Sequence, residues 1–199
     1  WTKSHLPGAS FTVGITTVTY TVQDQTGNTS TPCSFTVTVT DTQLPTITAP
    51  APITVSNDAG VCAASGVVPG VPVTADNCSV ASVTNNAPAV FPLGPTTVIW
   101  TVTDGAGNSA TATQIVTVID NELPKALCKS ITVNLDISGN ANITAAQIDN
   151  GSTDNCGIAS MTVAPNAFNS SNIGGNTVTL TVTDNSGDVS TCSSTVTVL

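Results

Sequence analysis

Apolar and polar residues alternate along much of this chain. Residues 35–40 read Phe-Thr-Val-Thr-Val-Thr, and residues 178–183 read Val-Thr-Leu-Thr-Val-Thr. Because successive side chains of a β-strand point to opposite faces, this alternation predicts strands that bury one face and expose the other. Long helices find no support, since apolar residues do not recur at spacings of three and four; residues 143–148 come nearest and predict at most one helical turn.

The chain repeats itself with a period of about 80 residues. Three segments share a pattern in which a strand leads into an Asp-x-x-Gly turn, namely residues 18–28, 98–108 and 178–188. A second motif, Asp-x-x-Leu-Pro, occurs at residues 41–45 and again at 120–124. Self-similarity at a fixed period indicates an array of repeated modules.

The two motifs set the boundaries of the predicted modules. Residues 42–120 and 121–199 each form a whole unit, whereas residues 1–41 form the C-terminal part of a truncated module, and the parent polypeptide is expected to continue on the N-terminal side. Several short strands separated by turn residues, in a unit of this size, are typical of an immunoglobulin-like β-sandwich. We therefore predict an all-β fold of tandem immunoglobulin-like β-sandwich modules in an extended array.

Charge narrows the range of partners. Charged residues make up 8% of the chain, the formal net charge is −9, and the only cationic side chains are Lys3, Lys125 and Lys129. Nucleic acids and anionic membrane surfaces both require a basic surface, so neither is an expected partner. No apolar run is long enough to cross a bilayer, and no membrane insertion is predicted.

The sequence contains no convincing set of catalytic residues. The single histidine, His5, lies in the truncated segment and leaves no Ser-His-Asp or Cys-His combination to propose. No Gly-rich phosphate loop follows a strand and opens a helix. Trp100 occupies the position of Tyr20 and Leu180 in the other repeats, which favours core packing over a sugar-binding platform. We predict that the chain is not an enzyme.

Aligning the repeats sorts the six cysteines. Cys33 and Cys192 share one position with Ala112. Cys128 shares another position with Ala49. Since the second repeat lacks both cysteines and the third has both, we predict a disulfide between Cys128 and Cys192, with the first and last strands of the module adjacent and parallel. Cys33 is then unpaired in this chain, and its partner is expected further upstream.

The remaining cysteines are Cys62, Cys78 and Cys156. Cys62 and Cys78 lie in the same repeat and are assigned to each other by elimination. Cys156 is left over and is predicted to be an unpaired, partly buried and unreactive thiol, because its surroundings are poor in cations. Disulfides in small modules indicate an oxidising compartment, so the chain is expected to be extracellular or displayed on the cell surface.

Four motifs resemble the hyalin repeat, or HYR, module. They are Phe91-Pro-Leu-Gly-Pro-Thr-Thr-Val98, Thr103-Asp-Gly-Ala-Gly-Asn108, Ala75-Asp-Asn-Cys78 and the junction Thr40-Asp-Thr-Gln-Leu-Pro-Thr-Ile-Thr48. The resemblance covers essentially the whole chain, and residues 121–199 are similar to a variant common in very large bacterial surface proteins. It implies tandem immunoglobulin-like modules of a large bacterial cell-surface or secreted adhesin, with a role as spacer and adhesive stalk and with no catalytic residue to carry over.

Acidic residues fall at turns, strand ends and module junctions. In a sandwich of this type the incoming linker and the turn before the last strand lie at the same pole of the module. Seven acidic residues are therefore candidate Ca²⁺ ligands at the junctions: Asp41, Asp76, Asp104, Asp120, Glu122, Asp154 and Asp184. Three or more carboxylates at each junction would supply the oxygen ligands that Ca²⁺ prefers. Asp also forms such turns by bonding its own backbone, and this explanation without a metal remains open.

The linkers and strand edges suggest a structural role. Pro45 and Pro124 are expected to restrict motion between modules, with Leu44 and Leu123 packed between neighbours. The predicted function is a structural repeat of an extracellular adhesin stalk or surface fibre, which spaces or presents a distal adhesive domain. Its partners would be further copies of the module, including self-association into a fibre through weakly protected strand edges. The alternative is a set of accessory modules of a secreted enzyme that bind a surface glycan or protein.

Overall fold

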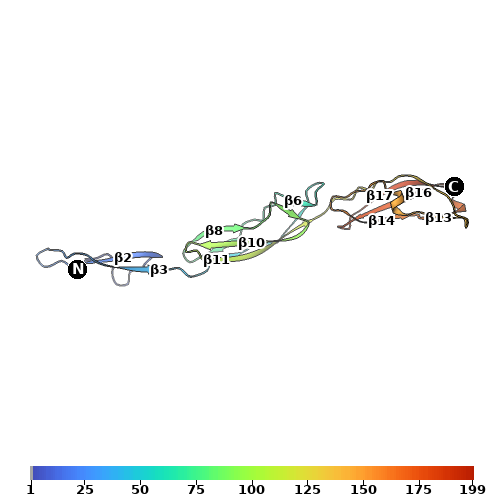
Figure 1. Ribbon diagram of the computed structural model, residues 1–199. Helices are drawn as coiled ribbons and strands as arrows, with labels where there is room; N and C mark the ends of the chain where they lie inside the picture. Colours follow the sequence, from blue (N-terminus) through green and yellow to red (C-terminus); the bar gives the residue numbers. More distant parts are fainter. Residues whose placement is uncertain (1) are drawn as a thin grey trace. The chain divides into compact units, whose positions relative to one another are not determined.

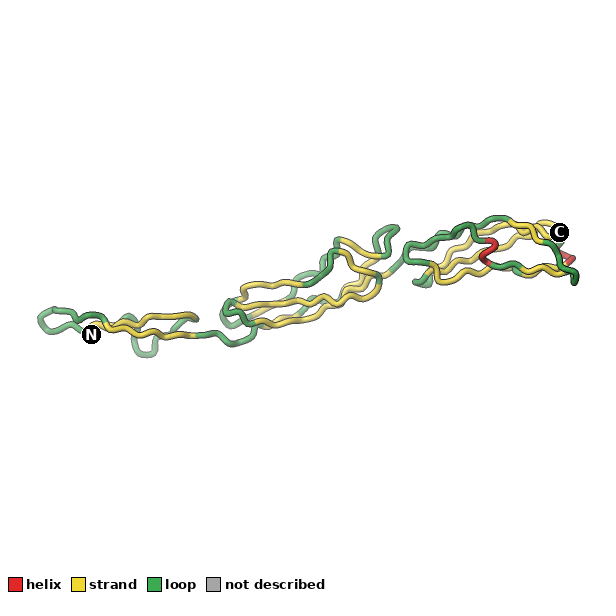
Figure 2. Tube along the Cα trace, in the orientation of Figure 1, coloured by secondary structure: helices red, strands yellow, loops and turns green. Residues whose placement is uncertain are grey.

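The computed structural model describes residues 2–199; Trp1, the first residue of the predicted truncated module, lies outside the described residues. Their regular structure is almost entirely β, with two short helical segments (Figure 2). The chain forms two compact units, one of residues 2–50, 70–86 and 98–114 and the other of residues 51–69, 87–97 and 115–199. The module boundaries after residues 41 and 120 stay a prediction, and the segments that they define are called the first, second and third repeats.

The first unit contains two sheets formed by segments ahead of residue 76. An antiparallel sheet has the order β1 (Thr2–Lys3), β2 (Gly14–Thr21) and β3 (Cys33–Val39). A two-stranded sheet joins β4 (Thr46–Thr48) to β7 (Val73–Ala75), with Thr46 opposite Ala75. Because these two strands are antiparallel, Asp76 follows β7 beside the start of β4.

Another sheet has the order β5-β11-β10-β8. Its strands are β5 (Ile53–Ser56), β8 (Val80–Asn85), β10 (Gly94–Asp104) and β11 (Ser109–Ile119). β8 pairs antiparallel with β10, whereas β5 pairs parallel with β11. Val98, Trp100 and Val102 alternate along β10 and are all buried, which confirms the core position predicted for Trp100.

The second unit contains a four-stranded sheet in the order β12-β17-β16-β14. Figure 1 labels its strands β14, β16 and β17. Its strands are β12 (Ile131–Val133), β14 (Ile158–Ala164), β16 (Gly174–Asp184) and β17 (Val189–Val198). Two small sheets pair β6 (Ala63–Ser65) with β9 (Val90–Pro92) and β13 (Asn140–Asn142) with β15 (Ala167–Asn169). The helical segments are α1 (Ala145–Ile148) and the 3₁₀ turn η1 (Ser170–Asn172). β12 and β17 are parallel neighbours, the arrangement that the sequence predicts for the ends of this repeat.

The core of the third repeat lies on one face of this sheet. Val178, Leu180 and Val182 alternate along β16 and are completely buried. Phe168 of β15 and Ile148 of α1 belong to the same buried cluster, so that β15 and α1 cover this face. The Thr residues between the buried positions of β16 remain partly exposed. The predicted alternation is therefore confirmed, and the fold is all-β and of the immunoglobulin-like β-sandwich class.

A buried polar pair joins β10 to β11. The indole Nε1 of Trp100 donates to Oε1 of Gln114 at 3.0 Å, and both side chains are at most 5% exposed. Replacing Gln114 by Met leaves the indole N–H buried without this acceptor, which we expect to lower the free energy of unfolding by about 2 kcal/mol. Urea denaturation followed by far-ultraviolet circular dichroism, a signal that does not depend on Trp100, measures the loss. A double-mutant cycle with Trp100→Phe is expected to give a coupling energy of about 1 kcal/mol, and a coupling energy of zero would contradict the hydrogen bond.

Candidate metal centre

The three Asp-x-x-Gly turns fold in the same way. In each turn the backbone N–H groups two and four residues after the aspartate donate to its Oδ1, at 2.8–2.9 Å. The three aspartates are Asp24, Asp104 and Asp184. The glycine of each turn has a φ of 94° or 95°, a region in which only glycine is unstrained. Turn chemistry therefore accounts for one carboxylate oxygen of each aspartate.

The second carboxylate oxygen distinguishes the third repeat from the others. Asn28 and Asn108 each donate a side-chain N–H to Oδ2 of their turn aspartate, at 3.0 Å and 2.8 Å. The hydrogen bond from the Asn28 side chain is the largest of several that lower the pKa of Asp24 to about 2. In the third repeat the equivalent residue is Asp188, which has no such donor. Oδ2 of Asp184 is buried, and without an Asn donor it has no hydrogen-bond partner among the described residues.

Asp184 shares a compact group with two other carboxylates. One oxygen from each of Asp120, Asp154 and Asp184 lies within 4.8 Å of the others. Asp120 follows β11 and is 6% exposed, and Asp184 ends β16 and is 1% exposed. Like charges held this close in a desolvated site repel one another unless a cation is shared between them. Grouped carboxylate oxygens are the ligands that Ca²⁺ prefers, so this donor set fits a calcium ion.

Asp154 is held in place by its own loop. Its Oδ2 accepts hydrogen bonds from the backbone N–H groups of Cys156 and Gly157, at 2.8 Å and 2.9 Å. Its Oδ1 is buried and finds no partner within residues 2–199. The fixed loop therefore presents one unpaired oxygen, as the turn of Asp184 does. Three carboxylates, two of them with an unpaired oxygen, make this the strongest candidate metal centre among the described residues.

The first unit contains a related but weaker group. It comprises Asp41, Asp76 and the thiol of Cys78, and Asp41 Oδ2 and Asp76 Oδ1 are buried without a partner among the described residues. Asp104, the equivalent of Asp184, is absent from this group. Its Oδ2 already accepts from Asn108, so it offers no unpaired oxygen. This group has only two carboxylates, and a thiol is a poor ligand for Ca²⁺.

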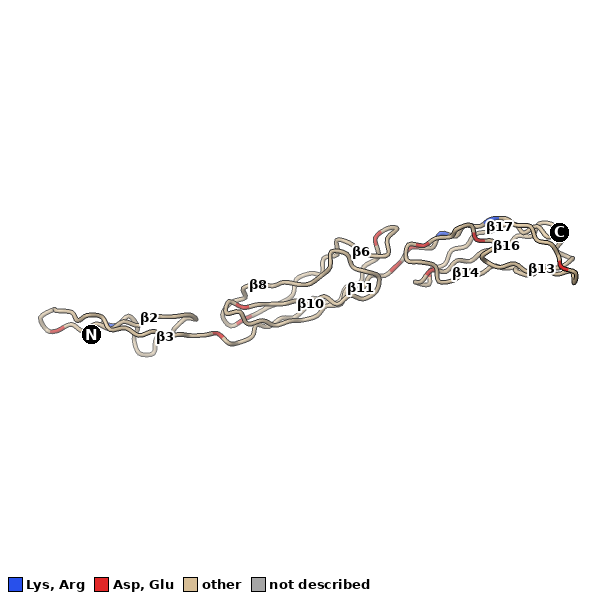
Figure 3. Tube along the Cα trace, in the orientation of Figure 1, with Lys and Arg blue, Asp and Glu red and all other residues tan. Residues whose placement is uncertain are grey.

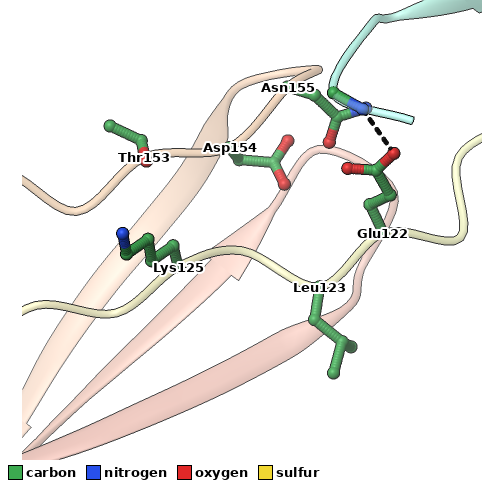
Figure 4. A pocket seen from close by; sticks show the side chains of 7 residues that line it. Glu122, Leu123, Lys125, Thr153, Asp154 and Asn155 are labelled. Atoms are coloured by element: carbon green, nitrogen blue, oxygen red, sulfur yellow. Dashed lines mark hydrogen bonds between the residues drawn. The ribbon is translucent and has the colours of Figure 1, made fainter. Parts of the chain in front are cut away.

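Glu122 binds the polypeptide backbone, although the sequence suggests it as a metal ligand. Its Oε1 accepts from the backbone N–H of Gly60 at 2.7 Å (Figure 4) and from Nδ2 of Asn57 at 3.5 Å. The carboxylate thereby holds the loop 57–62 of the second repeat against the start of the third. Of the seven predicted ligands, the structure brings together Asp41 with Asp76, and Asp120 with Asp154 and Asp184. Figure 3 shows the acidic residues in loops and at strand ends.

The disulfides differ in part from the sequence prediction. Cys128 is bonded to Cys192, as predicted, with 5.9 Å between their Cα atoms. Cys62, however, is bonded to Cys156 and not to Cys78, so that Cys156 is no unpaired thiol. The prediction by elimination assumed that each disulfide closes within one repeat. It failed because Glu122 and Asn121 hold the loop 57–62 beside the third repeat.

A signal for the correct pairing was present in the sequence. The tripeptide Asp-Asn-Cys occurs at residues 76–78 and at residues 154–156, which makes Cys78 and Cys156 equivalent. Equivalent cysteines are expected to take equivalent partners. Cys33 and Cys78 are exposed and are not in a disulfide within the described part of the chain. That Cys33 has its partner further upstream stays a prediction.

The prolines of the linkers are buried, and their leucines are not. Leu44 and Leu123 are 60% and 66% exposed, so the prediction that they pack between neighbouring modules is wrong for the described residues. Pro45 and Pro124 are buried in their place. None of the helices in residues 2–199 has the length and apolar character needed to traverse a membrane.

Comparison with known proteins shows which repeats this chain is similar to. Residues 2–39 match the HYR domain. Hyalin of Lytechinus variegatus is 33% identical over 214 aligned residues, which cover 99% of this chain and 39% of that protein. Hyalin of Strongylocentrotus purpuratus is 34% identical over 82% of this chain and 14% of that protein. The chain thus spans well under half of each relative, and these relatives give no support to the predicted bacterial origin.

Solved structures of low sequence identity also match. A human mucin-like protocadherin fragment, EC1-2, has a TM-score of 0.45 at 14% identity, with 78% of this chain and 98% of that chain covered. Drosophila N-cadherin EC1-4 has a TM-score of 0.44 at 12% identity, with 95% and 59% covered. The HYR match and the two hyalins show that this chain is similar to hyalin-type repeats, over residues 2–39 by the HYR match and over most of its length by the two relatives.

Proposed function

We propose that this chain is a repeat segment of an extracellular adhesion protein, and that it serves as a stalk in which Ca²⁺ fixes the junction between the second and third repeats. The observation that carries the proposal is the buried Oδ2 of Asp184, which lacks a hydrogen-bond partner among the described residues and belongs to a group of three carboxylates. A spacer function needs stiff junctions, and a shared cation at a junction supplies stiffness.

The extracellular location is supported by the cross-links. Structural disulfides such as these two are typical of oxidising compartments, and small modules outside the cell commonly depend on them. The similarity to hyalin extends over 99% of the chain and supports a repeat role for all of it. The disulfides, the similarity to hyalin and the repeated modules together support a role in adhesion outside the cell.

The candidate metal centre lies at the junction between the second and third repeats. Asp120 ends the second repeat, whereas Asp154 and Asp184 belong to the third, so an ion held by all three would join the two repeats. Asn155 already links the same elements, since its Nδ2 donates to Oδ1 of Asp120 at 3.3 Å. Ca²⁺ would replace repulsion between the carboxylates by attraction to a common charge.

Self-association into a fibre is part of the same proposal. β8 lies at the edge of its sheet, and all six of its residues are exposed. They read Val-Ala-Ser-Val-Thr-Asn, without a charged residue that would oppose pairing with another strand. This uncharged edge is the surface through which we propose that copies associate laterally.

Small-angle X-ray scattering in Ca²⁺ and in EDTA tests the stalk. We expect Ca²⁺ to narrow the distribution of maximum dimensions, and we expect Asp184→Asn to remove this response because the variant keeps the turn but loses a charged ligand. Asp136→Asn is the matched control, since Asp136 forms the same type of turn outside the group of three carboxylates. Forward scattering at increasing concentration reports the mass and hence self-association. A distribution that is identical in Ca²⁺ and EDTA would contradict the stiffened junction, and a constant monomer mass would contradict the fibre.

A further inference from the structure

The loops that carry Cys78 and Cys156 have the same internal geometry. In the first, Asp76 Oδ2 accepts from the backbone N–H groups of Cys78 and Ser79, at 2.8 Å and 2.9 Å. In the second, Asp154 Oδ2 accepts from the next two residues beyond Asn155 at the same two distances. The backbone at the two cysteines is therefore held by the same pair of hydrogen bonds. Only the sulfur of Cys156 is bonded within the described residues.

A hollow beside each loop is lined by equivalent positions. Next to Cys78 the lining residues are Gln43, Leu44, Thr46, Ala75, Asp76 and Asn77. Next to Cys156 they are Glu122, Leu123, Lys125, Thr153, Asp154 and Asn155, together with Gly60 (Figure 4). Gly60 has no counterpart in the first hollow. It belongs to the loop 57–62, which is seated there by Glu122 and ends at Cys62, the partner of Cys156.

The first hollow also contains a side chain that can accept a hydrogen bond from such a loop. Gln43 stands where Glu122 stands in the third repeat, and its side-chain amide has a carbonyl oxygen that can accept from a backbone N–H. Among the described residues, no loop lies in the first hollow in the way that the loop 57–62 lies in the second, and the thiol of Cys78 is exposed beside it.

We propose that Cys78 is the attachment point for a cysteine-bearing loop of another hyalin-type repeat. The loop is of the same kind as residues 57–62; it docks in the hollow at Gln43 and Leu44 and closes a disulfide equivalent to that between Cys62 and Cys156. The two thiols lose two protons and two electrons to a disulfide oxidant of the extracellular compartment, which is reduced to two thiols. The inference does not depend on calcium binding or on the stalk.

Cys33 is the alternative partner for Cys78, and the repeat pattern argues against it. Cys33 is the first residue of β3, and its equivalent in the third repeat is Cys192. Cys192 is bonded within its own repeat, to Cys128. The two exposed thiols therefore correspond to two different kinds of cross-link, one within a repeat and one between successive repeats.

Disulfide mapping of the native protein tests the attachment directly. The secreted protein is isolated without reductant, its thiols are blocked with N-ethylmaleimide, and linked peptides are sequenced by mass spectrometry. We expect Cys78 in a disulfide with a peptide from outside residues 1–199. Cys78 carrying N-ethylmaleimide, or linked to Cys33, would overturn the proposal.

A docking experiment on the 199-residue chain gives a second, independent measurement. The probe is a synthetic peptide of residues 52–66 whose Cys62 is activated as a mixed disulfide with thionitrobenzoate. The nearby Asp41 carboxylate, through a hydrogen bond, raises the pKa of the Cys78 thiol and lowers its reactivity, so rates are normalised to those with Ellman's reagent. We expect the normalised rate at Cys78 to exceed that at Cys33 about tenfold, because docking raises the local concentration of the probe. Gln43→Leu should abolish the difference, and equal normalised rates in the unmodified chain would contradict docking.

Discussion

Replacing Cys128 and Cys192 together by Ala is expected to lower the free energy of unfolding of the third repeat by about 4 kcal/mol. The disulfide closes a loop with a sequence separation of 64 residues, and restriction of the unfolded chain by a loop of this length gives a stabilisation of about 4 kcal/mol. Both cysteines also pack against the cluster around Leu180, so their side chains contribute to the core as well. A single module of this size has a total stability of only about 4–12 kcal/mol. The third repeat should therefore be close to unfolding without the bond.

Differential scanning calorimetry measures this loss, with hydrogen exchange of the β16 and β17 amides identifying the transition that belongs to the third repeat. Cys33→Ala is the control, because Cys33 is exposed and forms no disulfide within the described residues. It should change the free energy of unfolding by no more than about 0.5 kcal/mol. A loss below about 1 kcal/mol in the double variant would show that the unfolded chain is not restricted in the way that the loop length implies.

Calcium at 100 times its dissociation constant is expected to raise the free energy of unfolding of the third repeat by about 2.7 kcal/mol. The reason is that the three carboxylates come together only in the folded chain, so the ion binds the folded state alone. Asp184→Asn should remove most of the effect. The Asn side chain still accepts the two backbone hydrogen bonds of the turn through its carbonyl oxygen, while the negative charge and the unpaired carboxylate oxygen are lost.

Calorimetric scans in Ca²⁺ and in EDTA provide the measurement. Asp136→Asn should keep the full calcium response, because Asp136 accepts the same pair of backbone hydrogen bonds but lies outside the carboxylate groups found in residues 2–199. An equal response to calcium in the unchanged chain and in Asp184→Asn would place the ion elsewhere. No response in the unchanged chain would leave the buried oxygens of Asp154 and Asp184 without the partner proposed here.

The strands and the core were predictable because they follow a local rule. A period of two along residues 178–183 determines which side chains share a face, and the buried residues Val178, Leu180 and Val182 obey it. The Cys128–Cys192 bond was likewise predictable. The second repeat lacks both cysteines and the third has both, which indicates that the two positions are in contact. Sequence reasoning succeeds here because each conclusion needs only one repeat or a comparison of equivalent positions.

The parts that could not be predicted depend on contacts between successive repeats. The loop 57–62 is held by Glu122, whose carboxylate accepts from the backbone N–H of Gly60. Nothing in the sequence around Glu122 distinguishes it from the other acidic residues near the linkers. The unpaired oxygen of Asp184 follows from Asp188 in place of Asn, although both residue types are equally good turn formers. Only the structure shows that Asp188 leaves the buried Oδ2 of Asp184 without a hydrogen-bond donor.

The bond between Cys62 and Cys156 also determines how the chain would respond to mechanical force. It closes a loop with a sequence separation of 94 residues, which would reach about 320 Å at full extension. Tension applied at the two ends of the chain passes through the sulfur atoms, so the backbone of this loop, which includes β10 and β11, is outside the covalent force path. A chain with this cross-link would release the length of the loop under a pull only after reduction of the disulfide.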